Sequence, residues 1–168
     1  MQRLLPLLFL LFLTACNTDN NTVSVATEPK PLEHPFSLRI GDHTAYAEIA
    51  VSEREQRRGL MYRERLRTDH GMLFPYQQPR QMRFWMANTM IHLDIGFFDS
   101  EGVLREIHQM VAGDTQTTVS RRDDLQFALE MDQGWFRDKG IRPGTQMNLD
   151  DLRRALAGRG ADPRRYGL

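Results

Sequence analysis

The stretch RFWMANTMIHLDIGFF, Arg83 to Phe98, indicates a β-rich fold. Successive side chains of a β-strand point to opposite faces, so a strand is recognised by a period of two. Residues 81–86 and 93–98 follow this period and flank the connection ANTMIH, so we predict two strands. If these two strands pair across the connection, one shared face carries Met82, Phe84, Met86, Leu93, Ile95 and Phe97, and the other Arg83, Trp85, Asp94, Gly96 and Phe98.

Short strand-like segments continue on both sides of this stretch. They comprise a hairpin over 36–51, with its turn at Gly41–Asp42, and segments 71–74, 103–110, 125–131 and 145–149. Short strands at near-regular spacing, interrupted by Gly and Pro, are typical of an antiparallel sandwich or small barrel. The strand–helix alternation of parallel α/β proteins is not seen. We predict a mainly β fold, a compact antiparallel sandwich or barrel, with one to three short helices.

Helix signals occur at three places. Ser52 and Glu55 have the spacing of a capping box, in which each residue satisfies a backbone N–H of the other, and Gly59 limits the helix that follows. Asn148 is a plausible N-cap for an amphipathic helix over 148–158. The segment 132–140 is the third helical candidate.

The N-terminal residues predict that the protein is located in the cell envelope. Arg3 precedes an apolar run, Leu4 to Leu13, which is too short to span a membrane and suits a signal peptide over residues 1–15. The run ends in LTAC, which resembles the lipobox of bacterial lipoproteins, so we expect Cys16 to be lipidated and to anchor the protein to a membrane. An ordinary secretory signal that leaves Cys16 free is the alternative. Asn17 favours the outer membrane, facing the periplasm.

The rest of the chain is predicted to be a tether over residues 16–35 and a single β-rich domain over 36–168 with a C-terminal helix. Cys16 is the only cysteine, which excludes a disulfide within the chain and a zinc site built from cysteines. Basic and acidic residues balance at 22 each, so we expect no nucleic-acid partner.

Six motifs resemble one family in order and spacing. They are RGLMYRERL (58–66), GMLFPY (71–76), FWMANT (84–89), LDIGFFD (93–99), ALEMDQGWF (128–136) and GIRPG (140–144). The chain is thereby similar to the domain of unknown function 192, DUF192. The resemblance implies a compact, jelly-roll-like β domain and implies no activity. Ala87 departs from the family pattern, which often has a basic residue there.

Strand parity places the candidate binding site on the polar face. An aromatic ring beside an arginine and a carboxylate suits a polar ligand such as an envelope glycan, with contacts from Arg83, Trp85, Asn88, Asp94 and Glu130. The alternative is structural, with an Arg83–Asp94 ion pair stacked on Trp85 that simply covers the sheet, and Asn88 satisfying a turn. We expect a non-catalytic binding or accessory module without a cofactor.

Two other functions are open at this point. Asp94 and Glu130 could act as the acid–base pair of a hydrolase if their carboxyl groups lay about 5 to 10 Å apart. Met82, Met86 and Met90 could bind Cu(I) if the segment were helical, whereas in a strand Met82 and Met86 would stand about 13 Å apart. Methionine as core filler is the simpler interpretation.

Overall fold

The structure is a computed structural model that describes residues 34–168. The signal peptide, the lipidation of Cys16 and nearly all of the tether fall on residues outside that range, so they stay predictions. Among the described residues, no helix has the length and apolar character needed to cross a membrane.

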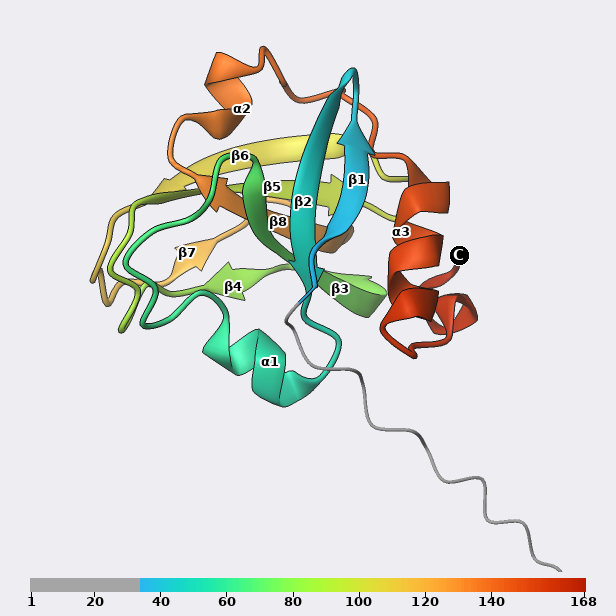
Figure 1. Cartoon of the computed structure of the whole chain (residues 1–168), viewed down its shortest axis with the longest axis horizontal. Coiled ribbons are helices and arrows are strands. Elements are labelled where there is room, and N and C mark those ends of the chain that lie inside the picture. The colour runs from blue at the N-terminus through green and yellow to red at the C-terminus, as the bar shows by residue number, and fades with distance from the viewer. Residues whose placement is uncertain (1–33) are drawn as a thin grey trace, which may run out of the picture.

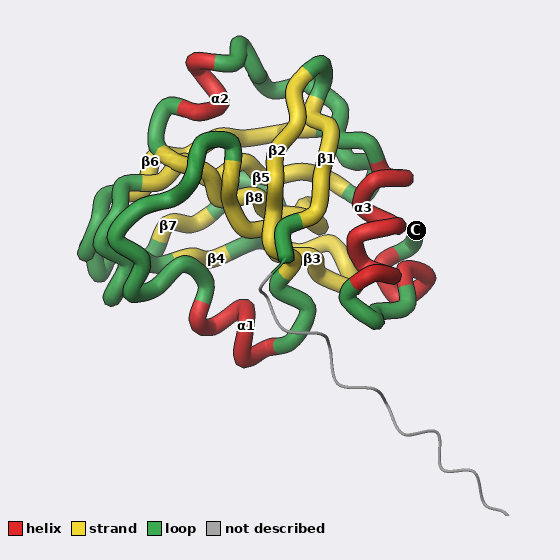
Figure 2. The backbone as a smooth tube through the Cα atoms, in the orientation of Figure 1, coloured by secondary structure: helices red, strands yellow, loops and turns green. Residues whose placement is uncertain are grey.

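Strands dominate the described part of the chain (Figures 1 and 2). A six-stranded sheet has the order β1-β2-β3-β8-β5-β6, and β4 and β7 form a separate two-stranded ribbon. The bounds are β1 Phe36–Ile40, β2 His43–Ile49, β3 His70–Arg80, β4 Arg83–Phe84, β5 Leu93–Asp99, β6 Leu104–Met110, β7 Thr118–Val119 and β8 Leu125–Asp132. The mainly β prediction is confirmed.

The sheet is mixed, so the prediction of a wholly antiparallel sheet was wrong for one pair. β2 and β3 run parallel, with Tyr46 opposite His70 and Ile49 opposite Leu73, while the other pairings are antiparallel. Parallel neighbours need a crossover instead of a hairpin, and the chain supplies one through α1 and the loop after it. The predicted hairpin of β1 and β2 is present.

Residues 144–148 connect the two edge strands. Met147 bridges to Ile40 in β1, and Gln146 bridges to Val103 next to β6. The backbone N–H of Gly41 donates to the Gln146 carbonyl, with N and O 2.8 Å apart, and that of Met147 donates to the Gly102 carbonyl at 2.8 Å. The segment predicted as a strand over 145–149 is thus a pair of single-residue bridges that close the sheet toward a barrel, protecting both edges.

Three short helices and a 3-10 turn complete the fold. α1, Glu53–Arg58, begins with the predicted capping box, and α3, Leu149–Gly158, begins at Asn148, whose side chain accepts from the Asp151 N–H. α2 spans Trp135–Asp138, and η1 spans Pro163–Tyr166. All three predicted helices are therefore present.

The sheet buries both of its faces. On one face, α3 and α2 pack on an inner core that includes Leu38, Leu73, Phe98, Leu129, Phe136 and Leu152. On the opposite face, the segment after α1 and the β4 strand cover an outer core that includes Leu60, Met72, Phe74, Phe84, Ile95 and Phe97. All seven residues of β5 are buried, so its polar face is covered rather than open.

The pairing of residues 81–86 with 93–98, on which the shared polar face depended, does not occur. β4 is only two residues long and pairs with β7, with Arg83 opposite Val119 and Phe84 opposite Thr118. β5 lies between β6 and β8 instead. The apolar side chains of both segments do share the outer core, so the dry face was correctly grouped although the strand pairing was not.

Candidate functional site

The predicted Arg83–Trp85–Asp94 face does not form. Trp85 is 56% exposed, whereas Asp94 is buried at 3% exposure on the inner-core side of β5. The space expected beside Gly96 is filled, because a Cβ atom there would lie 2.7 Å from the Cζ atom of Phe136. Burial of Asp94 has a local reason, since its Oδ2 atom accepts the Gly134 N–H at 2.8 Å.

Asp94 and Glu130 do not form the pair that a hydrolase would need. Asp94 stands opposite Met131 in the β5–β8 register, and Glu130 stands opposite Ile95. Directly opposed residues of antiparallel strands point to the same face. Glu130 therefore shares the outer-core face with Ile95, whereas Asp94 points to the inner-core face with Met131.

The three methionines proposed for copper do not converge. Met82 and Met86 are buried in the outer core, whereas Met90 is 65% exposed. The segment is not helical, so the spacing that would align their sulfur atoms is lost. Within residues 34–168, no group of three or more His, Cys, Asp or Glu side chains is placed to hold a metal ion.

The structure does bring Trp85 and Glu130 together, at a small cavity on the outer-core side. The cavity has a volume of about 30 Å³. Its walls come from α1 and the segment after it, from β3, from β4 and its following turn, and from β8. The lining residues are Gln56, Arg57, Arg58, Gly59, Leu60, Met61, Phe74, Phe84, Trp85, Thr89 and Glu130. We call this the Glu130 cavity.

Glu130 is the unusual group of this cavity. It is 5% exposed, and no hydrogen bond among the described residues uses its carboxyl group. Its cross-strand neighbours are Met72 and Ile95, both fully buried and apolar. Burial without a partner disfavours the charged form, which raises the pKa of Glu130 to about 8. At neutral pH its carboxyl group is therefore mainly protonated, so it can both donate and accept a hydrogen bond.

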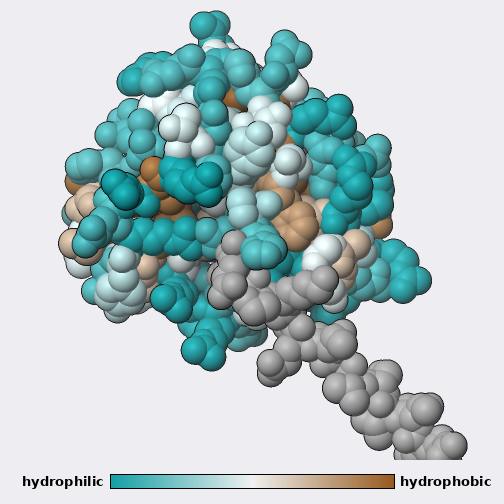
Figure 3. Space-filling view, in the orientation of Figure 1, coloured by the Kyte–Doolittle hydropathy of each residue, from teal (hydrophilic) through white to brown (hydrophobic). Residues whose placement is uncertain are grey.

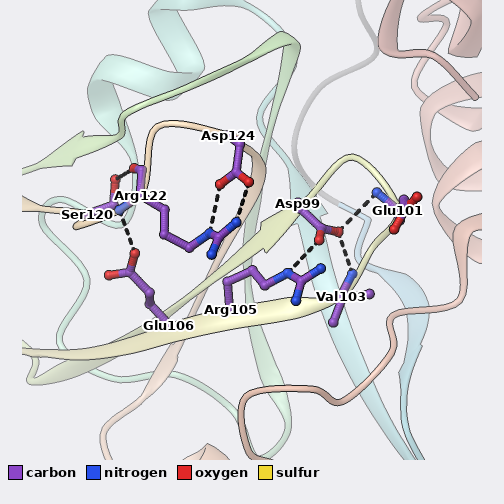
Figure 4. A network of polar contacts seen from close by, with 8 residues as sticks. All are labelled: Asp99, Glu101, Val103, Arg105, Glu106, Ser120, Arg122 and Asp124. Atoms are coloured by element: carbon purple, nitrogen blue, oxygen red, sulfur yellow. Dashed lines mark hydrogen bonds and ion pairs between the residues drawn. The ribbon is translucent and has the colours of Figure 1, made fainter.

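A second buried glutamate shows how such a group is ordinarily satisfied. The Glu106 carboxylate accepts the backbone N–H groups of Arg121, at 3.0 Å, and Arg122, at 2.8 Å, and it contacts His108 Nε2 at 2.6 Å. Figure 4 shows this region, where Arg105 also pairs with Asp99 and Arg122 with Asp124. The hydrogen-bonding groups of Glu106, Arg121, Arg122 and His108 satisfy one another. We call this network the Glu106 clasp, and it joins β6 to the β7–β8 connection.

The wall formed by α1 is fixed to the sheet by polar contacts. The Gln56 side-chain amide donates to the carbonyl groups of Ala50, at 3.2 Å, and Pro75, at 3.0 Å. The buried Arg159 donates to Glu55 and to the Ile49 carbonyl. The cavity is thus held in place before any ligand arrives, which lowers the entropic cost of binding.

Asn88 supports the turn beside the cavity and does not line it. Its backbone is left-handed, with φ of +59°, and its carbonyl accepts the Tyr62 N–H at 2.8 Å. Asn tolerates this conformation better than most residues. The turn interpretation of Asn88 fits this geometry, and the turn places Trp85 and Thr89 at the cavity.

Sequence reasoning missed the wall formed by residues 56–61. The signal was present, because RGLM lies in a motif of the family resemblance, but nothing local linked it to Glu130. The two segments meet only through the β2–β3–β8 order of the sheet. Glu130 itself was recognisable as a single acid in an otherwise apolar strand.

Comparison with known proteins gives the family. The DUF192 model, described as uncharacterised, matches residues 36–149. The chain belongs to this family. No curated protein matches it.

Two solved structures resemble this DUF192 chain. One is a protein of Sinorhizobium meliloti, described as a candidate transcription regulator, with 32% identity, a TM-score of 0.65 and coverage of 67% of this chain and 92% of that one. The other is a protein of unknown function from Novosphingobium aromaticivorans, with 30% identity, a TM-score of 0.63 and coverage of 67% and 83%. They support the β-rich fold and assign no activity.

Proposed function

We propose that this DUF192 protein is a non-catalytic binding module that inserts one hydroxyl-bearing group of a polar ligand, such as an envelope glycan, into the Glu130 cavity. The observation that carries the proposal is the Glu130 carboxyl group, which has no hydrogen-bond partner among the described residues and lines a cavity beside the exposed Trp85. Buried polar groups are nearly always paired, so an unpaired one facing a cavity indicates a ligand or water position.

The size of the cavity limits what enters it. About 30 Å³ admits one or two groups the size of water, such as a hydroxyl or a hydroxymethyl group. The rest of the ligand would lie outside, against the ring of Trp85. An aromatic face beside a hydrogen-bonding carboxyl group matches the apolar face and the hydroxyl groups of a sugar ring.

The charges at the cavity favour a neutral or anionic ligand over a cation. Arg58 and Arg57 line it, Arg57 in a surface ion pair with Glu53, and the Glu130 carboxyl group is mostly neutral at pH 7. Two guanidinium groups repel an ammonium group, whereas they can contact acidic substituents of a glycan. A hydrolytic function is not supported, because Glu130 is the one carboxylic acid among the described residues that line the cavity.

The proposal includes the location of the protein. The LTAC motif supports lipidation of Cys16, with a tether that holds the domain away from the membrane and facing the periplasm. Asn17 favours the outer membrane. Detection of the acylated Cys16 by mass spectrometry tests this part independently of ligand binding, and a mature chain that begins at another residue would contradict it.

Nucleic acid is not part of the proposal, although one relative is described as a candidate transcription regulator. Basic and acidic residues balance in the sequence. Several arginines also pair with carboxylates, as in Arg63–Glu48 and Arg105–Asp99. Nucleic-acid binding depends on unneutralised positive charge.

Calorimetric titration of the purified full chain with neutral and acidic monosaccharides and envelope glycan fragments tests the binding function. We expect binding that Trp85→Ala and Glu130→Leu, which removes both the donor and the acceptor, each weaken about tenfold, which corresponds to about 1.4 kcal/mol. Tyr62→Ala is the matched control, because Tyr62 is an exposed aromatic residue that does not line the cavity. The absence of binding at about 10 mM ligand, or equal loss in all three variants, would contradict the proposal.

A further inference from the structure

A second cavity lies on the opposite side of the sheet, next to α2. It has a volume of about 360 Å³ and is lined by residues of β5, β6, α2 and the loop that follows α2. α2 and this loop lie beyond β6, away from α1 and the Glu130 cavity (Figure 1). Its volume is within the usual range of small-molecule sites, about 300 to 1,000 Å³. We call it the Asp94 cavity.

The carboxyl group of Asp94 is only half satisfied. Its Oδ2 atom accepts the Gly134 N–H, but its buried Oδ1 atom has no hydrogen-bond partner among residues 34–168. An unpaired buried acceptor costs about 1 to 3 kcal/mol, so it is rarely retained without a compensating contact. Asp94 also lines the cavity.

Two guanidinium groups lie at the same cavity. Arg137 and Arg142 both line it, and both are exposed. Arg137 packs against the turn that holds Asp94, since a Cβ atom on Gly134 would lie 2.7 Å from Arg137 Nη2. The ion pair of Arg137 with Asp138 is a surface pair and therefore weak, so this side chain can turn toward a ligand at little cost.

We propose that the Asp94 cavity binds a free amino acid, with the ligand ammonium group beside the Asp94 carboxylate and the ligand carboxylate on Arg137 and Arg142. The negative charge of an ionised Asp94 attracts an ammonium group, and guanidinium groups match a carboxylate through paired N–H donors. Burial raises the pKa of Asp94, so a bound ammonium group would favour ionisation of the carboxyl group. The affinity for the amino acid should therefore fall as pH falls and Asp94 becomes protonated.

This inference is independent of the proposed glycan site. Asp94 and Glu130 lie on opposite faces of the sheet, and the two cavities share no lining residue. Loss of one function therefore leaves the other measurable. Glu130→Gln should retain amino-acid binding, and Asp94→Asn should retain glycan binding.

Titration of the purified full chain with alanine and two of its derivatives tests the inference. N-acetylalanine lacks the ammonium group, and alanine amide lacks the carboxylate. We expect alanine to bind and each derivative to bind at least tenfold more weakly. No alanine binding at about 20 mM, or equal binding of all three compounds, would overturn the inference.

Variants locate the site. Asp94→Asn keeps an acceptor for the Gly134 N–H but loses the charge, and Arg142→Gln alters an exposed side chain whose loss does not disturb the core. We expect both variants to bind alanine at least tenfold more weakly. The matched control is Arg153→Gln on α3, which should bind like the parent. Arg142→Gln binding like the parent, or Arg153→Gln losing binding equally, would overturn the assignment.

Discussion

Glu106 and Glu130 are both buried on the same face of one sheet, yet one carboxyl group accepts several hydrogen bonds and the other accepts none from the described residues. They stand opposite Phe97 and Ile95 respectively, two outer-core residues on alternate positions of β5. Burial alone would raise the pKa of either carboxyl group. At Glu106, hydrogen bonds from the Arg121 backbone, His108 and the Arg122 backbone outweigh burial and lower the pKa.

Glu130 has no such donors, so burial acts alone and its pKa rises to about 8. The difference lies in the neighbouring segment. A loop turns its N–H groups toward Glu106, whereas Glu130 stands between the apolar Met72 and Ile95 at a small cavity and accepts no backbone N–H among the described residues. One glutamate is therefore part of the scaffold, and the other is the group that we propose contacts a ligand.

The largest expected effect is on the pH dependence of stability. The pKa of Glu130 is 4.5 in an ordinary setting and about 8 in the fold, so the unfolded chain loses this proton first as pH rises. The contribution of Glu130 is therefore most favourable below about pH 4.5 and is lost progressively up to about pH 8. The loss is on the order of 4 kcal/mol in the free energy of unfolding.

Urea unfolding of the parent and Glu130→Gln between pH 5 and pH 8 measures this effect. Glutamine has a similar shape and does not titrate, so the variant should gain stability over the parent as pH rises. Parallel stability curves for the two proteins would show that Glu130 is ionised in the fold at pH 5.

Removal of the satisfied glutamate should be the next largest effect. Glu106→Ala leaves two backbone N–H groups and His108 without their acceptor, which should lower the free energy of unfolding by about 3 kcal/mol. Thermal unfolding at pH 7 measures it. Glu101→Ala, at an exposed glutamate, is the control and should stay within about 0.5 kcal/mol. Equal stability of Glu106→Ala and Glu101→Ala would contradict the structural role of Glu106.

A change in the wall of the Glu130 cavity should have an intermediate effect. Gly59 has φ of +48° and ψ of −136°, a conformation that suits glycine, so Gly59→Ala should cost about 2 kcal/mol through backbone strain. The Cβ atom would also reach 3.6 Å from the Phe74 ring. Gly113→Ala is the comparison, because it shares the positive φ (+72°) but has nothing within 4 Å of the added Cβ atom, so it measures backbone strain without the contact with Phe74. Denaturant unfolding measures the effect. If Gly59→Ala is as stable as the parent, alanine is not strained at this position.

The smallest expected effect separates backbone from side-chain donors. Glu106 is held by the N–H of Arg122, not by its guanidinium group, which pairs with Asp124 at the surface. Arg122→Ala should therefore change the free energy of unfolding by no more than about 0.5 kcal/mol. A loss as large as that of Glu106→Ala would mean that the guanidinium group is essential to the Glu106 clasp.

The sequence was sufficient for the local features of this fold. The β1–β2 hairpin, the Ser52–Glu55 capping box and the Asn148 N-cap depend on neighbours within a few residues. Strand parity also separated Ile95 from Asp94 correctly. These patterns are set by backbone geometry, so they are visible without knowledge of the partner strand.

The candidate site could be predicted only in part, because its members meet through long-range pairing. Trp85 and Glu130 were both identified, but Arg83 and Asp94 were assigned to their site through a strand pairing that does not occur. β8 lies between β3 and β5, so Glu130 lies under the segment that follows α1. Nothing in the period of a strand specifies which strand it pairs with.

The most direct test of the central claim is the pKa of Glu130, measured by carbon-13 NMR of the side-chain carboxyl groups as pH is varied. The assignment of its signal follows from its absence in Glu130→Gln. An unpaired, buried carboxyl group at the cavity predicts titration near pH 8. Titration at or below 4.5, the ordinary value, would show that Glu130 is paired or well solvated in the fold, which would contradict its role as the ligand-binding group.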